Sequence, residues 1–183
     1  MIRRTIKEHL DKEMRLRPRG IKVLSLFFID SVENYRKYDA DGTPQKGPLA
    51  TIFEEEYRRQ AKLPEYVSLF EGADLTTAAA EVHDGYFSID RKGRWTEVSV
   101  DEKGELKNEA SREAAGRAFS LIMREKERLL SFETPLKFIF SHSALKEGWD
   151  NPNVFQICSL RDIRTERERR QSIGRGLRLC VNQ

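Results

Sequence analysis

The sequence predicts an α/β fold, built on a mainly parallel β-sheet flanked by helices. Three short apolar runs, rich in branched and aromatic residues, have the length and composition of buried strands: residues 21–29, 136–141 and 154–160. Segments with helical periodicity lie between them, and strands that alternate with helices are typical of a parallel sheet. At 183 residues and 21.3 kDa, the chain has room for a single domain, residues 1–183.

The first predicted element is an amphipathic helix. Its apolar side chains recur at every fourth position and line one face: Ile2, Ile6, Leu10 and Met14. Pro18 and Gly20 end the helix. The basic residues lie largely off the apolar stripe, so they form a solvated face or, alternatively, a DNA contact.

The strand predicted over residues 21–29 ends in a polar pair. Asp30 and Ser31 follow the apolar run directly and can cap the next helix. The end of a buried strand is also where α/β folds place their ligands, which gives Asp30 an alternative role.

The middle of the chain contains a predicted loop over 39–48, helices over 49–63, 65–71 and 108–130, and strands over 82–89 and 95–100. In the helix over 49–63, Ile52 and Phe53 fall on the apolar side and Glu54 on the polar side. The two strands form a small β-hairpin, about residues 82–100, which is an insertion or an antiparallel edge of the sheet. His83 and Asp84 suggest catalytic or metal chemistry, but no neighbouring residues complete a ligand set or a triad.

The charge distribution and the cysteine content limit the functions that the chain can have. The net charge is only +3, yet seven arginines and three acidic residues fall between Arg161 and Arg178. Such an excess suits a phosphate-bearing partner, and a solvated charged face is the alternative. Cys158 and Cys180 have neither metal-ligand spacing nor a disulfide framework, so no metal site is expected. Without an apolar run of membrane-spanning length or a signal peptide, we expect a soluble, cytoplasmic protein with no membrane partner.

A first motif, SALKEGWDNPNV, follows the strand predicted over 136–141. Gly148 permits a sharp turn or a close approach of backbone to a ligand, and Asp150 can orient nearby donors. The hydroxyl of Ser141 or Ser143 can bind a nucleic-acid phosphate. An ordinary connection between a strand and a loop is the alternative interpretation.

A second motif, RRQSIGRGLR, contains Gln171, Gly174, Arg175 and Arg178 in the order Gln-x-x-Gly-Arg-x-x-Arg. Arg175 and Arg178 are three residues apart and share one side of a helical turn, and Gln171 lies one turn earlier. The planar guanidinium suits phosphate, and an arginine finger accelerates phosphoryl transfer by about 10³ to 10⁵. A charged surface helix is the alternative.

The two motifs, in this order and spacing, resemble the fifth and sixth motifs of superfamily 2 helicases, and VLSLFFID near the start resembles the fourth. The runs IKVLSLFFID, VHDGYFS, SALKEGWDNPNVFQIC and QSIGRGLRLCVNQ further resemble the restriction (Res) subunit of type III restriction-modification enzymes. The resemblance covers residues 1–183. It implies a RecA-like domain, the second motor domain of an ATP-dependent DNA translocase or helicase within a type III site-specific deoxyribonuclease.

The resemblance also implies roles for single residues. Arg175 and Arg178 match the catalytic arginines that reach across an interdomain cleft to ATP, and Gln171 matches an ATP-binding position. Gly148 and Asp150 match positions of the ATP site that couple nucleotide state to DNA.

The nucleic-acid contact remains open between two serines. His142 stands where many helicases have threonine, so that Ser141 and Ser143 are both candidates for the phosphate contact.

The implied cofactors are ATP and magnesium in the full enzyme, with none bound by this chain alone. The implied partners are double-stranded DNA, an N-terminal RecA-like domain and a nuclease domain of the same polypeptide, and a modification (methyltransferase) subunit. The sequence contains no Gly-x-x-x-x-Gly-Lys-Ser/Thr loop, so we expect a piece of a longer protein that is inactive in isolation. The alternative is a non-catalytic nucleic-acid-binding or interaction domain with a helicase-like fold.

Overall fold

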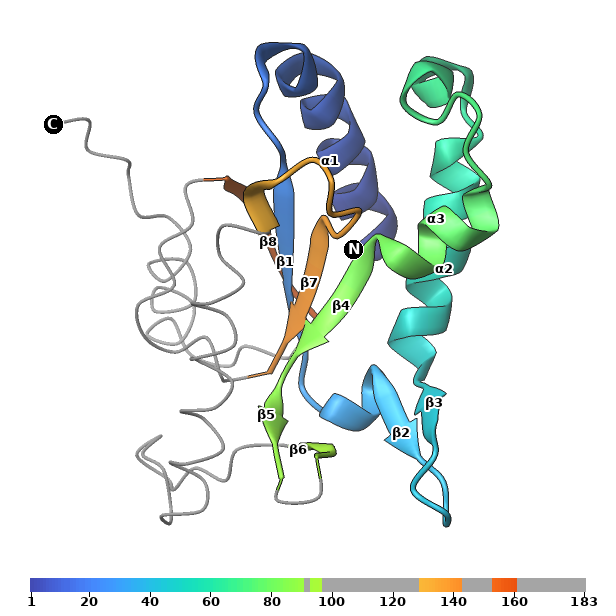
Figure 1. Cartoon of the computed structure of the whole chain (residues 1–183), viewed down its shortest axis with the longest axis vertical. Helices are drawn as coiled ribbons and strands as arrows, with labels where there is room; N and C mark the ends of the chain where they lie inside the picture. Colours follow the sequence, from blue (N-terminus) through green and yellow to red (C-terminus); the bar gives the residue numbers. More distant parts are fainter. Residues whose placement is uncertain (91–92, 97–128, 143–152, 161–183) are drawn as a thin grey trace, which may run out of the picture.

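In a computed structural model of the chain, the residues described are 1–90, 93–96, 129–142 and 153–160 (Figure 1). Four of their strands form one sheet in the order β4-β7-β1-β8, and every neighbouring pair is parallel. These strands are β1 (Leu24–Phe28), β4 (His83–Tyr86), β7 (Phe138–Ser141) and β8 (Val154–Ser159). The predicted α/β class with a mainly parallel sheet is confirmed, and the arrangement is consistent with a RecA-like domain.

The three apolar runs of the sequence form three adjacent strands. Residues 21–29 contain β1, residues 136–141 contain β7, and residues 154–160 contain β8. β1 lies between the other two, and all five of its residues are buried. A parallel strand covered on both faces is expected to be apolar throughout, which is why the run was recognisable from composition.

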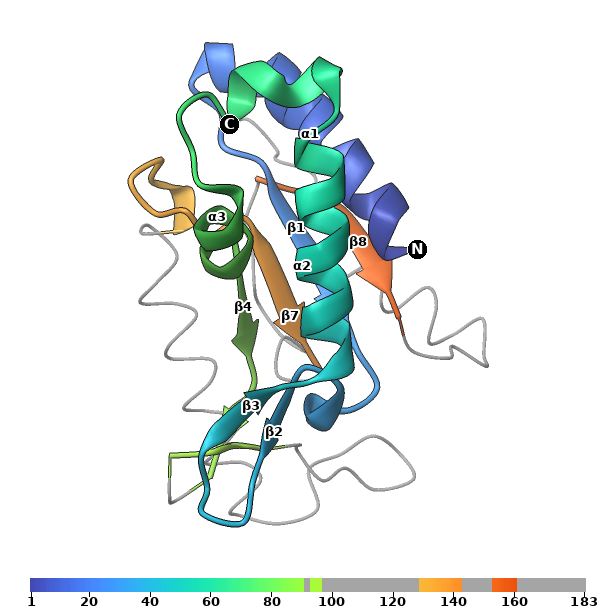
Figure 2. The same cartoon turned by 90° about the vertical axis from the view of Figure 1, so that its right-hand side faces the viewer.

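Helices α1 (Ile2–Leu16) and α2 (Pro48–Ala61) lie side by side across one face of the sheet (Figure 2). The predicted apolar stripe of α1 faces the sheet, and the side chains of Ile6 and Leu10 are fully buried. The helix ends in a 3₁₀ turn, η1 (Arg17–Arg19). Gly20 closes this turn with φ of 72°, a left-handed conformation that glycine adopts without a Cβ clash.

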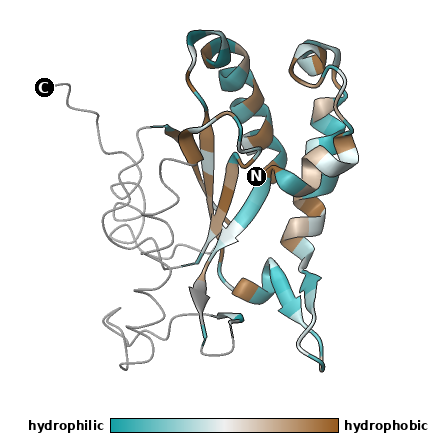
Figure 3. Ribbon diagram, in the orientation of Figure 1, coloured by the Kyte–Doolittle hydropathy of each residue, from teal (hydrophilic) through white to brown (hydrophobic). Residues whose placement is uncertain are grey.

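Hydrophobic side chains fill both faces of the sheet, and strands β1, β7 and β8 are its most apolar part (Figure 3). The cluster on the side of α1 and α2 includes the stacked and edge-on rings of Phe27, Phe53, Tyr57, Phe138 and Phe140. The cluster on the opposite face contains Leu24, Leu26, Phe28, Tyr86, Leu129 and Ile139. Alternate residues of β1 therefore contribute to each cluster, as strand geometry requires.

The packing of α2 corrects the sequence prediction at two positions. Phe53 is fully buried, as expected, but Ile52, placed on the apolar side, is 45% exposed. Glu54, placed on the polar side, is only 6% exposed. The reason is that this flank of the helix is covered by a hairpin and by β4, from which Lys46 and His83 contact the Glu54 carboxylate.

That hairpin consists of the antiparallel strands β2 (Arg36–Tyr38) and β3 (Pro44–Lys46). β3 lies inside the segment over 39–48 that composition predicted to be a loop, so the loop prediction is wrong there. Asp39 explains the error, because its carboxylate accepts hydrogen bonds from the backbone of Asp41 and Thr43 in the turn. Turn-forming residues dominate the composition of a segment whose ends are nevertheless paired.

The second hairpin begins later in the chain than predicted. β5 (Ser88–Ile89) pairs with β6 (Trp95–Thr96) in an antiparallel ribbon. The single strand predicted over 82–89 is divided at Phe87: β4 belongs to the parallel sheet, and only β5 belongs to the hairpin. Both hairpins lie at the end of the molecule toward which β4 points (Figure 1).

The remaining short elements are η2 (Val32–Asn34), η3 (Pro64–Leu69) and α3 (Leu75–Glu81). η3 corresponds to the helical stretch predicted over 65–71, whereas α3 was not predicted. The helix predicted over 108–130 lies outside the described residues, except for residues 129 and 130, which are helical.

Candidate functional site

Three strands end level with one another at the carboxyl edge of the sheet. Phe28, the last residue of β1, is paired with Ser141 of β7 on one side and with Ser159 of β8 on the other. Neighbouring strands are about 4.8 Å apart, so Ser141 and Ser159 are separated by roughly 10 Å. The chain after β7 and the chain after β8 therefore leave the sheet from the same edge, on either side of β1.

The two sequence motifs follow these strand ends along the chain, and the second of them begins at Arg169. The first motif starts at residue 143, two residues beyond Ser141, and the arginine-rich segment starts at residue 161, two residues beyond Ser159. Hydrogen bonds hold the backbone together just past the strand ends. Ile29 N donates to Ser141 O at 3.0 Å, and Leu160 N donates to Phe28 O at 2.7 Å. The strand ends that precede both segments are thus fixed relative to each other.

Of the predicted site residues, Ser141 is in the described part of the chain. Its side chain is fully buried, and its hydroxyl donates to the Tyr86 carbonyl at 3.1 Å, which ties the end of β7 to β4. The other predicted site residues lie outside the described residues: Ser143, Gly148, Asp150, Gln171, Arg175 and Arg178. Their roles stay predictions.

The turn after β1 is braced by its own polar side chains. Oδ1 of Asp30 accepts hydrogen bonds from Ser31 N at 2.9 Å and from Asn34 Nδ2 at 2.7 Å. The Ser31 hydroxyl accepts from Glu33 N and caps η2. The predicted capping role of this pair is confirmed, with Ser31 as the cap and Asp30 as the brace of the turn.

A second polar group, at β4, shows what His83 does. His83 Nδ1 lies 2.7 Å from the Tyr35 hydroxyl, and Nε2 lies 3.3 Å from Oε1 of Glu54. The same Glu54 oxygen is 2.6 Å from Lys46 Nζ. If Nε2–H donates to Glu54, Nδ1 accepts from the Tyr35 hydroxyl, and every member of the row has a partner. Burial lowers the pKa of His83 to about 4, despite the opposing influence of Glu54, so the ring is neutral at pH 7.

His83 is therefore a buried residue with a polar partner on each ring nitrogen. No group of three or more histidine, cysteine or acidic residues could hold a metal ion within the described ranges. A cavity of about 480 Å³ opens beside this row along β4. Its lining comes from segments between residues 35 and 136, so no local sequence signal could have found it.

The parallel sheet defines an α/β protein. Its candidate site lies outside the carboxyl ends of the strands, where folds of this class bind ligands. None of the helices in the described part of the chain combines the length and apolarity needed to cross a membrane.

Comparison with known proteins adds a specific relationship. No family model matches the chain. The whole chain aligns with the Type III restriction-modification enzyme EcoP15I Res subunit of Escherichia coli, with 39% identity over 192 residues. It also aligns, with 40% identity over 191 residues, with the EcoPI Res subunit of Escherichia phage P1. The StyLTI Res subunit of Salmonella typhimurium is 36% identical over 185 residues, covering 89% of the chain.

The chain spans 17% of the length of each of the first two relatives and 16% of the third. It is therefore homologous to one segment of type III Res subunits.

Proposed function

We propose that the chain is the second RecA-like motor domain of a type III restriction enzyme, where it serves an ATP-dependent DNA translocase. The observation that carries the proposal is the level pairing of Phe28 with Ser141 and Ser159. It places the residues from which the chain continues toward the two helicase-like motifs at one edge of a parallel sheet, and the homology to Res subunits covers both motifs.

In this proposal, ATP and magnesium bind mainly to a preceding RecA-like domain, because no phosphate-binding loop occurs in these 183 residues. Bound magnesium would offset the negative charge of the phosphates. This chain contributes Arg175 and Arg178, whose guanidinium groups are permanently charged and match the geometry of a phosphate. Gln171, Gly148 and Asp150 would complete the contacts between the edge and the nucleotide.

DNA would lie across a surface shared by both motor domains. Ser143 and the residues that follow β7 would bind its phosphates, which position a duplex without reading its sequence. Opening and closing of the cleft between the domains would then move the duplex. A nuclease domain of the same polypeptide and a modification subunit would supply cleavage and site recognition.

The test uses the longer polypeptide expected to contain this chain, with DNA-stimulated ATP hydrolysis as the measurement. Arg175→Ala is expected to lower kcat by about 10³ or more, with a much smaller change in KM, because the guanidinium acts on the transition state. Arg59→Ala is the matched control, since Arg59 lies on α2 and pairs with Glu56. Equal rates for the two variants would refute the arginine-finger role.

A second arm uses the 183-residue chain alone. We expect no ATP hydrolysis from it, with or without DNA. Turnover by the isolated chain, or a natural gene that encodes only this segment, would favour a different function, such as a nucleic-acid-binding module with a helicase-like fold.

A further inference from the structure

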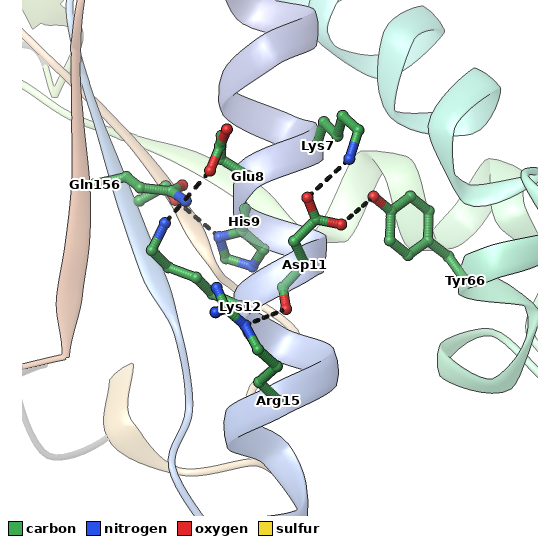
Figure 4. Close-up of polar contacts among 9 residues, drawn as sticks. Lys7, Glu8, His9, Asp11, Lys12, Arg15, Tyr66 and Gln156 are labelled. Carbon is green, nitrogen blue, oxygen red and sulfur yellow. Dashed lines mark hydrogen bonds and ion pairs between the residues drawn. The ribbon is translucent and has the colours of Figure 1, made fainter.

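A row of buried polar side chains links β8 to α1 through β1. The Ser25 hydroxyl donates to Oε1 of Gln156 at 2.7 Å, and His9 Nδ1 lies 2.8 Å from the same hydroxyl. His9 and Ser25 are fully buried. Figure 4 shows Gln156 reaching from its strand toward His9 on the helix. Polar groups in such a place must be paired to be tolerated, so the row has a definite geometry.

The hydrogen bonds of this row can be donated in either direction along it, and in both cases Gln156 is bonded to Ser25. With the Gln156 oxygen as acceptor, His9 Nε2, Glu13 Oε2 and Gln156 Nε2 have no hydrogen-bond partner in the described part of the chain. Turning the amide lets Gln156 Nε2 donate to Ser25, Ser25 donate to His9 Nδ1, and His9 Nε2 donate to Glu13, 3.5 Å away.

The register of β8 depends on this row because the other residues of the strand, except its last residue Ser159, are apolar and are distributed over both faces. Val154 and Ile157 pack into the cluster with Leu24 and Leu26, and Cys158 packs into the cluster under α1. A strand with one apolar face is held in register because a one-residue slip would expose that face. In β8 such a slip exchanges one set of apolar side chains for another, so hydrophobic burial discriminates weakly between registers.

Gln156 distinguishes the native register of β8 from a slipped one. The register of the pairing with β1 shifts by one residue between Leu24 and Ser25. Leu24 is opposite Val154, and Ser25 is opposite Gln156. Phe155 is the extra residue of this irregularity, and its side chain is 38% exposed. A slip in either direction would place an apolar side chain against Ser25 and His9 and leave both without their partner, a penalty of the kind that fixes register in coiled coils.

We propose that Gln156, held by Ser25 and His9, fixes the register of β8 and thereby positions the segment that begins at residue 161. The second half of this inference rests on the proposed function, since that segment carries Arg175 and Arg178. A one-residue slip moves a strand by about 3.3 Å. A displacement of 1 Å can lower a rate by about 10², so the register is a requirement for catalysis. Gln156 is a positioning residue.

The direct test measures register in the 183-residue chain by nuclear Overhauser contacts between backbone protons of β1 and β8. Gln156→Leu is expected to fold but to give more than one set of resonances for residues 154–159, with contacts of Ser25 to more than one residue of β8. Ile157→Val, a loss of one methyl group from the opposite face, is the control and is expected to retain one register. A single native register in Gln156→Leu overturns the proposal.

Gln156→Leu can prevent folding because it leaves Ser25 and His9 without a partner. A triple variant avoids this problem. His9→Leu/Ser25→Ala/Gln156→Leu replaces the whole row by apolar groups, which is often neutral for stability. It is expected to fold with mixed registers. If neither this chain nor Gln156→Leu folds, Gln156 acts in stability and the register proposal is overturned.

The proposed effect of the β8 register on ATP hydrolysis is tested in the longer polypeptide. Gln156→Leu is expected to lower the kcat of ATP hydrolysis at least 10-fold with KM within about 2-fold, whereas Ile157→Val retains the parent rate. Mixed registers with an unchanged kcat overturn the positioning role. Mixed registers together with a parent protein that hydrolyses no ATP overturn the proposed function and leave the register assignment standing.

Discussion

Nζ of Lys137 lies 2.5 Å from Oε1 of Glu13, joining the start of β7 to a helix 124 positions earlier in the chain. Burial opposes the ionisation of Glu13. The contact with His9 Nε2, 3.5 Å from Oε2, and the charge of Lys137 outweigh it, and the pKa of Glu13 falls to about 2. The carboxylate is 4% exposed and depends on these partners to remain charged inside the protein.

Lys137→Met removes the cation and leaves a buried charge without compensation. We expect the free energy of unfolding to fall by about 3 kcal/mol or more, measured by urea denaturation at pH 7. Lys12→Met is the matched control on α1. Lys12 is 3.7 Å from the more exposed Glu8, and the loss there should be below about 1 kcal/mol. Similar losses in both variants would show that the Glu13–Lys137 pair adds little.

Acid should destabilise the chain well above the range where carboxylates titrate. Burial lowers the pKa of His83 from 6.5 to about 4, so between these values the unfolded chain binds a proton that the folded chain does not. Stability from this group is present above pH 6.5 and is lost as the pH falls toward 4, by about 2 kcal/mol at pH 5. Burial of His9 acts in the same direction.

His83→Asn removes the titrating ring and keeps an acceptor for Tyr35. The variant should show a smaller loss of stability between pH 7 and pH 5 than the parent chain, measured by urea denaturation at both values. An unchanged pH dependence would mean that His83 does not titrate in this window. A further loss below pH 4.5, where unfolded Glu13 takes up a proton, should persist in the variant.

The sequence was sufficient to find three strands of the sheet, and insufficient for their order and for the polar interior. Buried parallel strands are apolar throughout, and this property is local, so β1, β7 and β8 could be found from composition. The order of the strands depends on contacts between residues more than 100 positions apart, such as Ser25 with Phe138 and with Gln156. No local pattern encodes such pairing.

Around the candidate site, too, features that depend on neighbouring residues could be predicted, and features that depend on distant residues could not. Capping by Ser31 could be predicted because it depends on neighbouring residues. The burial of Glu54 could not, since it results from Lys46 and His83, which lie on other elements. The two motifs were recognisable in the sequence, but the level ends of β7 and β8 on either side of β1, which precede them, depend on pairing between distant residues.

Gly47 allows the β2–β3 hairpin to join α2. A Cβ at this position would lie 2.5 Å from the backbone carbonyl atoms of Asn34 and Glu33, which cannot move independently. Gly47→Ala should therefore lower the free energy of unfolding by about 3 kcal/mol, within the range of severe overpacking. Gly42→Ala is the control. Gly42 has φ of 81° with open space around it, so only the left-handed backbone penalty of about 1–2 kcal/mol applies.

Thermal or urea unfolding of the two variants distinguishes a clash from backbone strain. A Gly42→Ala chain less stable than Gly47→Ala would show that the junction between hairpin and helix moves apart to admit a methyl group.

Ser141 and Ser143 should differ in what their hydroxyl groups do. The Ser141 hydroxyl is buried and donates to the Tyr86 carbonyl, so Ser141→Ala should cost about 1–2 kcal/mol of stability and leave DNA affinity unchanged. If Ser143 binds a phosphate, Ser143→Ala should weaken DNA binding about 5- to 10-fold with little change in stability.

Fluorescence anisotropy with a labelled duplex, in the longer polypeptide, measures the affinities of both variants. The dependence of affinity on salt should be the same for both, because serine carries no charge and releases no counterion. A loss of affinity in Ser141→Ala alone would assign the phosphate contact to Ser141, and would require its hydroxyl to leave the Tyr86 carbonyl when DNA binds.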